Sequence, residues 1–182
     1  MGSLLSSLYG LWSGSRNYKL LIVGLNNAGK TSILYSLQLN KFISTQPTIG
    51  GNAEEIKFRN LTFVAWDLGG QEQLREVWHM YYHATDAVIF VVDSAEPARF
   101  SVAHKELTQL LQHDELKDAC VLVFANKQDL QGAMPAAKII EALGLVNVTD
   151  RRWTVQGCSA VTQQGLHEGM SWISAQLGED AS

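Results

Sequence analysis

Two uninterrupted apolar runs restrict the fold of this chain more than any other feature. They are Val88-Ile89-Phe90-Val91-Val92 and Val121-Leu122-Val123-Phe124, and neither alternates with polar residues. Strands of this kind are buried on both faces, which is typical of a parallel sheet with helices on each side. Helix-period segments separate the strand-like runs, as the crossovers between parallel strands require. The pattern predicts an α/β fold.

The remaining strand-like and helix-like segments extend this prediction to the whole sheet. Strands are expected over residues 18–23, 55–59, 61–67, 87–93, 120–126 and 153–158, and helices over residues 30–39, 98–112, 135–143 and 165–177. Only Asn60 separates the second and third strands, so these two must form an antiparallel hairpin. We therefore expect a doubly wound, mostly parallel six-stranded sheet with one antiparallel edge. Ligands of such sheets bind at the carboxyl ends of the strands.

Composition is that of a globular protein with no general affinity for nucleic acid. The 182 residues are 46% hydrophobic, which is enough for a core without disulfides, and the net charge of −4 gives no basic field for a polyanion. Cys120 and Cys158 are isolated and lie in apolar stretches, which favours a reducing cytosol over a disulfide or zinc framework. The longest apolar runs are far shorter than the ~20 residues that span a bilayer, so no transmembrane segment is expected.

A glycine-rich loop joins the first expected strand to the first expected helix. Its residues are Gly24-Leu25-Asn26-Asn27-Ala28-Gly29-Lys30-Thr31, which match G-x-x-x-x-G-K-[ST] in the required strand–helix context. Such a loop wraps its backbone N–H groups around phosphates at the positive end of the helix. Lys30 is expected to contact the β- and γ-phosphates, and the Thr31 hydroxyl to bind Mg²⁺. We call residues 24–31 the glycine-rich loop.

Asn126-Lys127-Gln128-Asp129 follows the strand expected over residues 120–126, at a carboxyl end where a base could lie. The Asp129 carboxylate can accept hydrogen bonds from guanine N1–H and from the exocyclic amine. Adenine presents acceptors there and would leave the carboxylate unpaired, at a cost of several kcal/mol if it is buried. Together with the glycine-rich loop, this tetrapeptide predicts guanine.

Trp66-Asp67-Leu68-Gly69-Gly70-Gln71 ends the second hairpin strand. Asp67 is placed like the aspartate that steadies Mg²⁺ through water at the end of an apolar strand. Gly70 lets the backbone approach a γ-phosphate, and Gln71 is the candidate catalytic residue because it can orient the attacking water.

These motifs, with Pro47-Thr48-Ile49-Gly50 and Cys158-Ser159-Ala160, resemble those of the Arf and Arf-like small GTPases over nearly the whole chain. The resemblance implies a GTP/GDP switch that requires Mg²⁺, in which Thr48 completes the metal coordination and Ala160 offers its N–H to the guanine carbonyl. It also implies an exposed effector patch of Ile49, Trp66, Trp78 and Tyr81, although aromatic residues 78, 81 and 82 could equally be core. The implied nucleotide contacts are Gly24, Leu25, Asn26, Asn27, Ala28, Gly29, Lys30, Thr31, Thr48, Asp67, Gly70, Asn126, Lys127, Asp129, Ser159 and Ala160.

The expected reaction is in-line attack of water on the γ-phosphate. Residues 39–51 contain no arginine that could reach that phosphate in cis. Intrinsic hydrolysis is therefore expected to be slow, and a GTPase-activating protein that supplies an arginine could accelerate it roughly 10³–10⁵-fold. A nucleotide exchange factor and membrane effectors are the other partners that the resemblance implies, with the protein itself a monomer.

The amino terminus predicts a membrane anchor. Met1-Gly2-Ser3-Leu4-Leu5-Ser6 matches the signal for myristoylation of Gly2, and apolar residues at positions 4, 5, 8, 11 and 12 share one helical face. We expect an amphipathic helix and linker over residues 1–16 and the GTP-binding domain over residues 17–182. The helix could simply pack on the domain; the resemblance implies packing with GDP and release to the membrane with GTP, driven by a sliding hairpin. The expected location is the cytoplasm and the cytosolic face of internal membranes, above all the Golgi.

Three positions depart from the common Arf pattern, and one of them, Ser159, lies where the backbone is expected to make the contact. Asn26 stands where the family usually has Asp, which removes a negative charge beside the phosphates, and Gly51 stands where many members have a Phe of the effector patch. These departures favour an Arf-like member, and residues 51–56 resemble the Golgi-associated Arf-like protein five subgroup.

Two rival functions and one rival site stay open at this point. The chain could be a GTP-binding scaffold with negligible hydrolysis, or a P-loop kinase, although a kinase has no use for the tetrapeptide at 126–129. His79 and His83 have the i, i+4 spacing of a metal pair, but a solvated helix face explains them as well.

Overall fold

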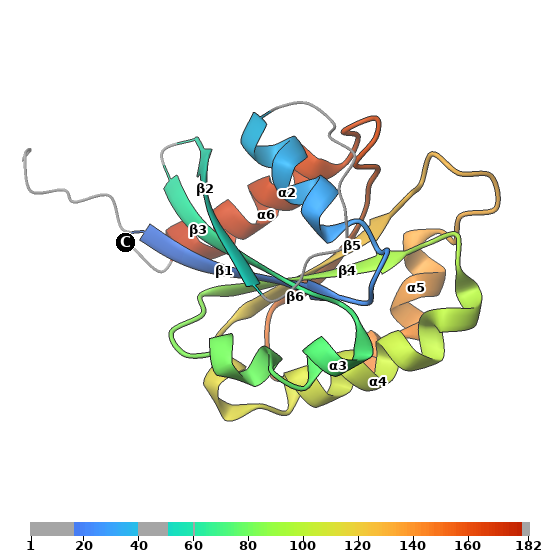
Figure 1. Ribbon diagram of the computed structural model, residues 1–182, viewed down its shortest axis with the longest axis horizontal. Helices are drawn as coiled ribbons and strands as arrows, with labels where there is room; N and C mark the ends of the chain where they lie inside the picture. Colours follow the sequence, from blue (N-terminus) through green and yellow to red (C-terminus); the bar gives the residue numbers. More distant parts are fainter. Residues whose placement is uncertain (1–16, 40–50, 60, 180–182) are drawn as a thin grey trace, which may run out of the picture.

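The computed structural model describes residues 17–39, 51–59 and 61–179, and its centre is a six-stranded sheet (Figure 1). The strand order is β2-β3-β1-β4-β5-β6, and every described pair is parallel except β2–β3. The bounds are β1 Asn17–Gly24, β2 Gly51–Phe58, β3 Leu61–Leu68, β4 Ala87–Asp93, β5 Cys120–Asn126 and β6 Trp153–Gly157. The doubly wound sheet with one antiparallel edge is confirmed.

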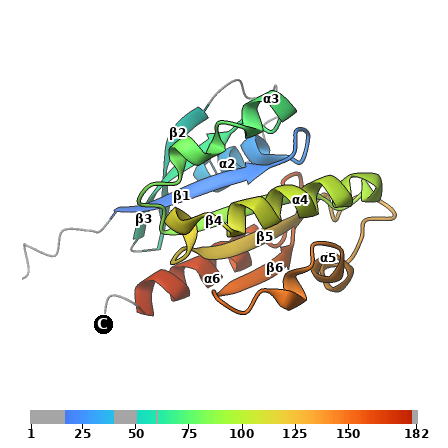
Figure 2. The ribbon, with the colours of Figure 1, turned by 90° about the horizontal axis from the view of Figure 1, so that it is seen from below.

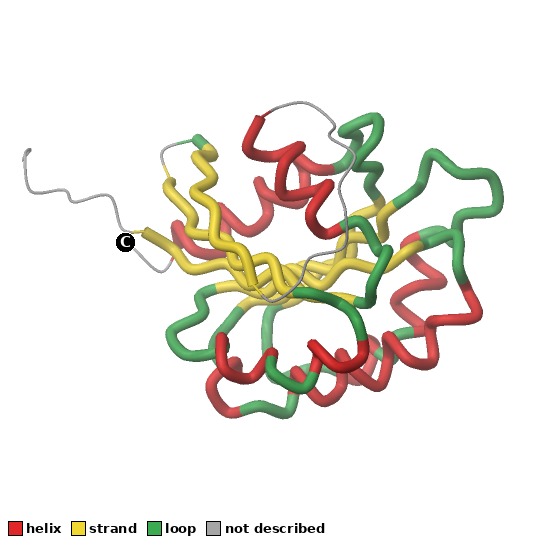
Figure 3. Tube along the Cα trace, viewed as in Figure 1, coloured by secondary structure: helices red, strands yellow, loops and turns green. Residues whose placement is uncertain are grey.

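Helices cover both faces of the sheet (Figures 1 and 2). On one face lie α2 (Lys30–Leu39) and α6 (Leu166–Glu179), and on the other lie α3 (Glu72–Arg75), α4 (Phe100–Leu111) and α5 (Ala136–Ala142). Short 3₁₀ turns are η1 (Trp78–Tyr81), η2 (Pro97–Arg99), η3 (Asp114–Leu116) and η4 (Leu145–Asn147). Figure 3 shows these helices and turns flanking a continuous layer of strands.

Successive residues of one strand enter opposite halves of the core. Ile89 of β4 and Leu122 of β5 pack in the cluster with α2 and α6, whereas their neighbours Val88 and Val121 pack in the cluster with α4 and α5. Both faces of β4 and β5 are buried under helices, and for this reason their sequences do not alternate between apolar and polar residues.

The β2–β3 hairpin is longer than the sequence predicts. β2 begins at Gly51 rather than at Glu55, and Gly51 pairs with Leu68. The alternation predicted for its second half is confirmed, because Ile56 is buried between exposed Glu55 and Lys57. Residues 51–54 have weak strand propensity, and the backbone ladder with β3 outweighs that preference.

Candidate nucleotide-binding site

The site lies where the carboxyl ends of β1, β3, β4 and β5 meet. The glycine-rich loop connects β1 to α2, and its two glycines have positive φ, 144° at Gly24 and 96° at Gly29. A Cβ on Gly24 would lie 2.2 Å from the Val91 carbonyl oxygen, and one on Gly29 would lie 2.3 Å from the Asn126 side-chain nitrogen. Glycine is therefore required at both positions by backbone angle and by space.

Lys30 is buried at the start of α2, with 6% of its surface exposed. Its Nζ donates to the Leu25 carbonyl oxygen at 3.0 Å, so the ammonium lies across the glycine-rich loop. Burial lowers the pKa of Lys30 to about 8, against the attraction of Asp67 and with a smaller lowering by Arg99. The ammonium would gain a strong counter-charge from a phosphate bound in this loop.

Thr31 and Asp67 meet between α2 and the end of β3. The Thr31 hydroxyl donates to the Asp67 carboxylate at 2.5 Å, and Asp67 is completely buried. A hydroxyl and a carboxylate at this distance are the hard oxygen donors that Mg²⁺ prefers, so the residues present fit that ion. Pairing of Asp67 with Ile22 of β1 fixes the carboxylate at this place.

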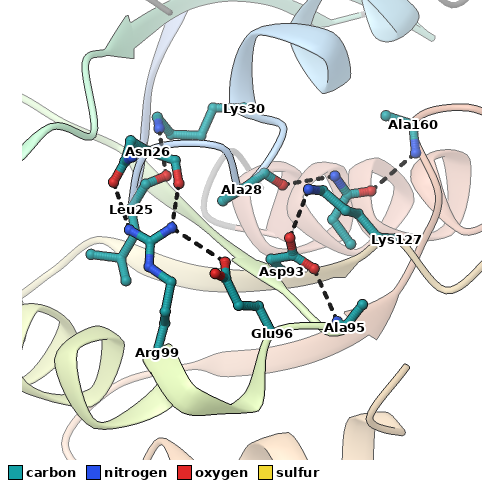
Figure 4. A network of polar contacts seen from close by, with 11 residues as sticks. Leu25, Asn26, Ala28, Lys30, Asp93, Ala95, Glu96, Arg99, Lys127 and Ala160 are labelled. Carbon is teal, nitrogen blue, oxygen red and sulfur yellow. Dashed lines mark hydrogen bonds and ion pairs between the residues drawn. The ribbon is translucent and has the colours of Figure 1, made fainter. Parts of the chain in front are cut away.

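Asn126 joins the two loops that the sequence assigns to phosphate and to base. Its side-chain nitrogen donates to the Ala28 carbonyl oxygen at 2.8 Å, and its side-chain oxygen accepts from the Ala160 N–H at 3.0 Å. The partners Ala28 and Ala160 are labelled in Figure 4. The residue is 2% exposed, so these hydrogen bonds have no water to compete with them. The side chain holds the glycine-rich loop and the loop after β6 at a fixed separation.

The segment after Asn126 leaves Asp129 exposed beside this junction. Lys127 has a positive φ of 66°, and its Nζ forms an ion pair of 2.6 Å with Asp93. Gln128 donates to the Ser94 hydroxyl and to the Met134 carbonyl oxygen. Asp93 is a site residue that the motifs do not reveal, because nothing in the sequence pairs it with Lys127.

Gly70 packs directly on the glycine-rich loop. The Asn26 N–H donates to the Gly70 carbonyl oxygen at 3.0 Å, and a Cβ on Gly70 would lie 2.4 Å from the Asn26 nitrogen. Gln71 follows at the N-terminal cap of α3 with its side chain exposed. The Gly70 backbone thus lies against the glycine-rich loop, and its approach to a γ-phosphate stays a prediction.

Arg99 is a second residue that the sequence analysis missed. From the end of η2, its Nη1 donates to the Asn26 carbonyl oxygen at 2.7 Å and its Nη2 donates to Asn26 Oδ1 at 2.6 Å (Figure 4). No local pattern links residues 26 and 99, which only the sheet topology brings together.

The expected effector patch is only partly a surface. Trp66 and Tyr81 are half-buried with ring centroids 5.5 Å apart, but Trp78 is 2% exposed and its Nε1 donates to the Gly69 carbonyl oxygen. Trp78 is therefore a core residue, which corrects its placement in the patch, and Tyr82 is also buried. A Cβ on Gly51 would lie 2.9 Å from Leu68 and 3.2 Å from the Tyr81 hydroxyl, so Tyr81 closes over that position.

The structure describes some of the remaining predicted site residues, and others lie outside the described ranges. Ser159 is buried and its hydroxyl accepts from the Thr162 N–H. The Ala160 N–H, which was expected to donate to guanine, donates to Asn126 Oδ1 in this structure. Gly2, Thr48 and Ile49 lie outside the described residues.

The possible metal pair His79 and His83 has no further ligands around it among the described residues. Within the part of the chain that is described, no group of three or more His, Cys, Asp or Glu could hold a metal, and His79 Nδ1 lies 2.9 Å from the Glu76 carbonyl oxygen.

A glycine-rich loop at the first β–α turn of a sheet in this order defines the class of P-loop small GTPase folds. Comparison with solved structures agrees: the "Arl6 BBS3 Small GTPase from Trypanosoma brucei with bound nucleotide analogue GppNp" has a TM-score of 0.84 and 31% identity, covering 90% of this chain and 99% of that one.

Sequence comparisons narrow the class. The family model of the ADP-ribosylation factor family matches residues 3–177. The chain is 46% identical over 181 residues to ADP-ribosylation factor-like protein 1 of Saccharomyces cerevisiae, covering 99% of each chain. It is also 46% identical over 178 residues to ADP-ribosylation factor-like protein 5 of Caenorhabditis elegans, covering 97% of this chain and all of that one. The chain belongs to the ADP-ribosylation factor family, and it is a GTPase that hydrolyses GTP to GDP and phosphate.

Across residues 17–39, 51–59 and 61–179, no helix combines the length and the apolar character that crossing a membrane requires.

Proposed function

We propose that this GTPase is a slowly hydrolysing molecular switch that recruits effectors to internal membranes in vesicle trafficking, the Golgi foremost among them. Two hydrogen bonds give the main support for the proposed nucleotide site: Asn126 donates to Ala28, and Ala160 donates to Asn126. They hold a phosphate-binding loop and a base-binding loop in one rigid unit, at the sheet edge where ligands of this fold bind.

The proposed nucleotide contacts are those that the motifs predict. The backbone of the glycine-rich loop surrounds the phosphates, Lys30 neutralises the terminal phosphates, and Asp129 accepts from guanine with Lys127 beside it. Thr31 and Asp67 would hold Mg²⁺, together with Thr48. When bound, this ion balances charge on the β- and γ-phosphates.

Gln71 is the proposed catalytic residue. Its side chain is exposed at the cap of α3, next to the glycine that touches the glycine-rich loop, so it can orient a water for in-line attack on the γ-phosphate. A GTPase-activating protein would add an arginine, and a nucleotide exchange factor would accelerate release of GDP. The scaffold with negligible hydrolysis is the competing function, and Asn26 beside Gly70 is the residue that favours it.

The proposed slide of the β2–β3 hairpin would break the contact between Thr31 and Asp67. Moving β3 by two residues along β1 would carry Asp67 about 7 Å from Thr31, while the same face of β3 would stay buried. The register of the hairpin and the magnesium site would then change together. Release of the amino-terminal helix, carrying a myristoylated Gly2, would couple this change to membrane binding.

Vesicle sedimentation tests the membrane role. The myristoylated full chain is loaded with GDP or with a non-hydrolysable GTP analogue and mixed with phosphatidylcholine–phosphatidylserine vesicles. We expect the GTP-analogue form to sediment and the GDP form to stay largely in solution, with Gly2→Ala as the unanchored control. Equal sedimentation of the two nucleotide forms would contradict a nucleotide-controlled membrane switch.

Single-turnover hydrolysis tests the enzymatic part. We expect slow release of phosphate from bound GTP, accelerated by an Arf-family activating domain and abolished in Gln71→Leu. Turnover at several per second without a partner would contradict slow hydrolysis, and no turnover with the activating domain would favour the scaffold.

A further inference from the structure

Arg99 donates two parallel hydrogen bonds to Asn26 of the glycine-rich loop. The two guanidinium nitrogens donate to the main-chain and side-chain oxygens of Asn26, at 2.7 and 2.6 Å. Figure 4 shows the guanidinium facing both oxygens from the opposite side of the loop from Lys30. Such a forked contact, in which both nitrogens of one guanidinium donate to one residue, fixes the orientation of Asn26 as well as its distance from Arg99.

Apolar packing and a small cavity both lie between the loop and α4 at this place, because Leu25, Phe100 and Ala103 belong to one buried cluster. A cavity of about 20 Å³ lies between them, lined by Leu25 and Ala28 of the loop, by Phe100 and Ala103 of α4, and by Glu96 and Arg99. The forked contact from Arg99 adds a directional polar link between the loop and the start of α4, beside a cavity that contributes no van der Waals contacts.

The charge of Arg99 is only partly compensated. Asn26 is neutral, and the nearest carboxylate is that of Glu96 at 3.4 Å, whose side chain is 45% exposed. Where Asp occupies position 26, as the resemblance to other Arfs implies, a carboxylate would cancel much of this charge.

Asn26 also connects Arg99 to the segment that follows β3. Its N–H donates to the Gly70 carbonyl oxygen, while its main-chain and side-chain oxygens accept from Arg99. The guanidinium, the outer part of the glycine-rich loop and Gly70 thus form one chain of contacts. A γ-phosphate would lie at this end of the loop, between Lys30 and Gly70.

We propose that Arg99 is a positioning residue for the triphosphate, which acts through neutral Asn26 to make the protein retain GTP in preference to GDP. The proposal rests on the nucleotide site proposed above. Arg99 does not need to touch the nucleotide: it fixes the loop beside the γ-phosphate and adds positive potential there. Because GDP lacks the γ-phosphate, it gains much less from either effect.

Dissociation rates of two fluorescent nucleotides test this preference. N-methylanthraniloyl GDP and N-methylanthraniloyl GppNHp are displaced from the full chain with Mg²⁺ present. For Arg99→Gln we expect GppNHp release to accelerate about tenfold and GDP release about two- to threefold, because both the fork and the charge are lost. Arg99→Lys keeps the charge without the fork, so it should restore most of the GppNHp/GDP ratio while both nucleotides leave somewhat faster.

Arg152→Gln is the matched control, because Arg152 also donates to a main-chain carbonyl, that of Gln176, but lies at the amino end of β6. Its release rates should equal those of the wild type. If Arg99→Gln fails to fold, Asn26→Ala removes one of the two acceptors and should raise the ratio by a smaller factor. An unchanged ratio in these variants overturns the proposal, whereas a wild-type protein that binds neither nucleotide overturns the nucleotide site itself.

Discussion

At the residue scale, Lys30 carries its charge where water hardly reaches it. Burial holds its pKa at about 8, and Asp67 offsets only part of that effect. In the unfolded chain the pKa returns to its ordinary value near 10.5, so between pH 8 and 10.5 the unfolded state binds more protons than the folded state. The nucleotide-free protein therefore gains stability from Lys30 as the pH rises through that interval, and is penalised below it.

Binding of GTP should reverse this penalty and take up protons. A phosphate in the glycine-rich loop favours the charged ammonium, so Lys30 should gain about 0.7 proton when GTP binds at pH 8.5, and little at pH 7.0 where it is already protonated. Calorimetric titration in two buffers of different ionisation enthalpy measures the proton count. The same count at both pH values would show that Lys30 does not meet the phosphates.

Asp129 should determine the base. In Asp129→Asn the amide nitrogen would face two guanine donors, so we expect GTP affinity to fall about 100-fold or more through two lost charge-assisted hydrogen bonds. Xanthosine triphosphate, which has a carbonyl in place of the exocyclic amine, should bind this variant better than GTP. Competition binding compares the two nucleotides, with Asp118→Asn at the opposite end of β5 as control. Unchanged GTP affinity in Asp129→Asn would remove Asp129 from the base site.

Short motifs predicted the residues that lie close together in sequence, and missed those that only the fold brings together. The Thr31–Asp67 contact follows from two separate motifs, each of which predicts a magnesium ligand. Arg99 and Asp93 belong to no motif, because their partners Asn26 and Lys127 lie on other strand–helix units. The sequence left Trp78 open between the effector patch and the core, and its indole N–H donates to the Gly69 carbonyl oxygen inside the core.

At the element scale, the register of β3 against β1 decides whether the proposed magnesium ligands meet. Asn17 pairs with Thr62 near the start of both strands, and Ile22 pairs with Asp67 near their end. A slide of β3 by two residues would break every pair of this ladder, so a bond across it should lock the register described here.

We expect a disulfide between Asn17→Cys and Thr62→Cys to bias the protein toward GTP. The locked register keeps Asp67 beside Thr31, so oxidation should raise affinity for a GTP analogue relative to GDP, about tenfold, and reductant should restore the original ratio. The natural thiols, Cys120 and Cys158, are buried and should not interfere. If mass spectrometry shows the cross-link complete and the affinity ratio does not move, the hairpin does not slide during the switch.

Strands were predicted better than the short helices. β4 and β5 occur where their apolar runs predict them, whereas α3 and η1 were not expected because four residues are too few to show a period. The predicted helix over residues 98–112 begins as the 3₁₀ turn η2 before α4, since Pro97 starts the turn. These differences do not move the site, which depends on strand ends and on sheet order.

At the scale of the whole molecule, the amino-terminal segment is proposed to act as a clamp on the GDP state. Deleting residues 2–13 should accelerate GDP release severalfold without lowering GTP affinity, because the segment is proposed to pack on the domain only with GDP. Stopped-flow displacement of fluorescent GDP measures the rate in the truncated and full chains. An unchanged rate would mean that this segment does not restrain the switch.

The central claim is that the whole chain works as a guanine-nucleotide switch, and the nucleotide that it carries tests this claim most directly. Purified protein is denatured, and the released nucleotide is identified and quantified by anion-exchange chromatography. The account predicts nearly one GDP per chain, because hydrolysis is complete and release is slow. Bound adenine nucleotide would contradict the assigned role of Asp129, and predominant GTP would contradict hydrolysis by this chain.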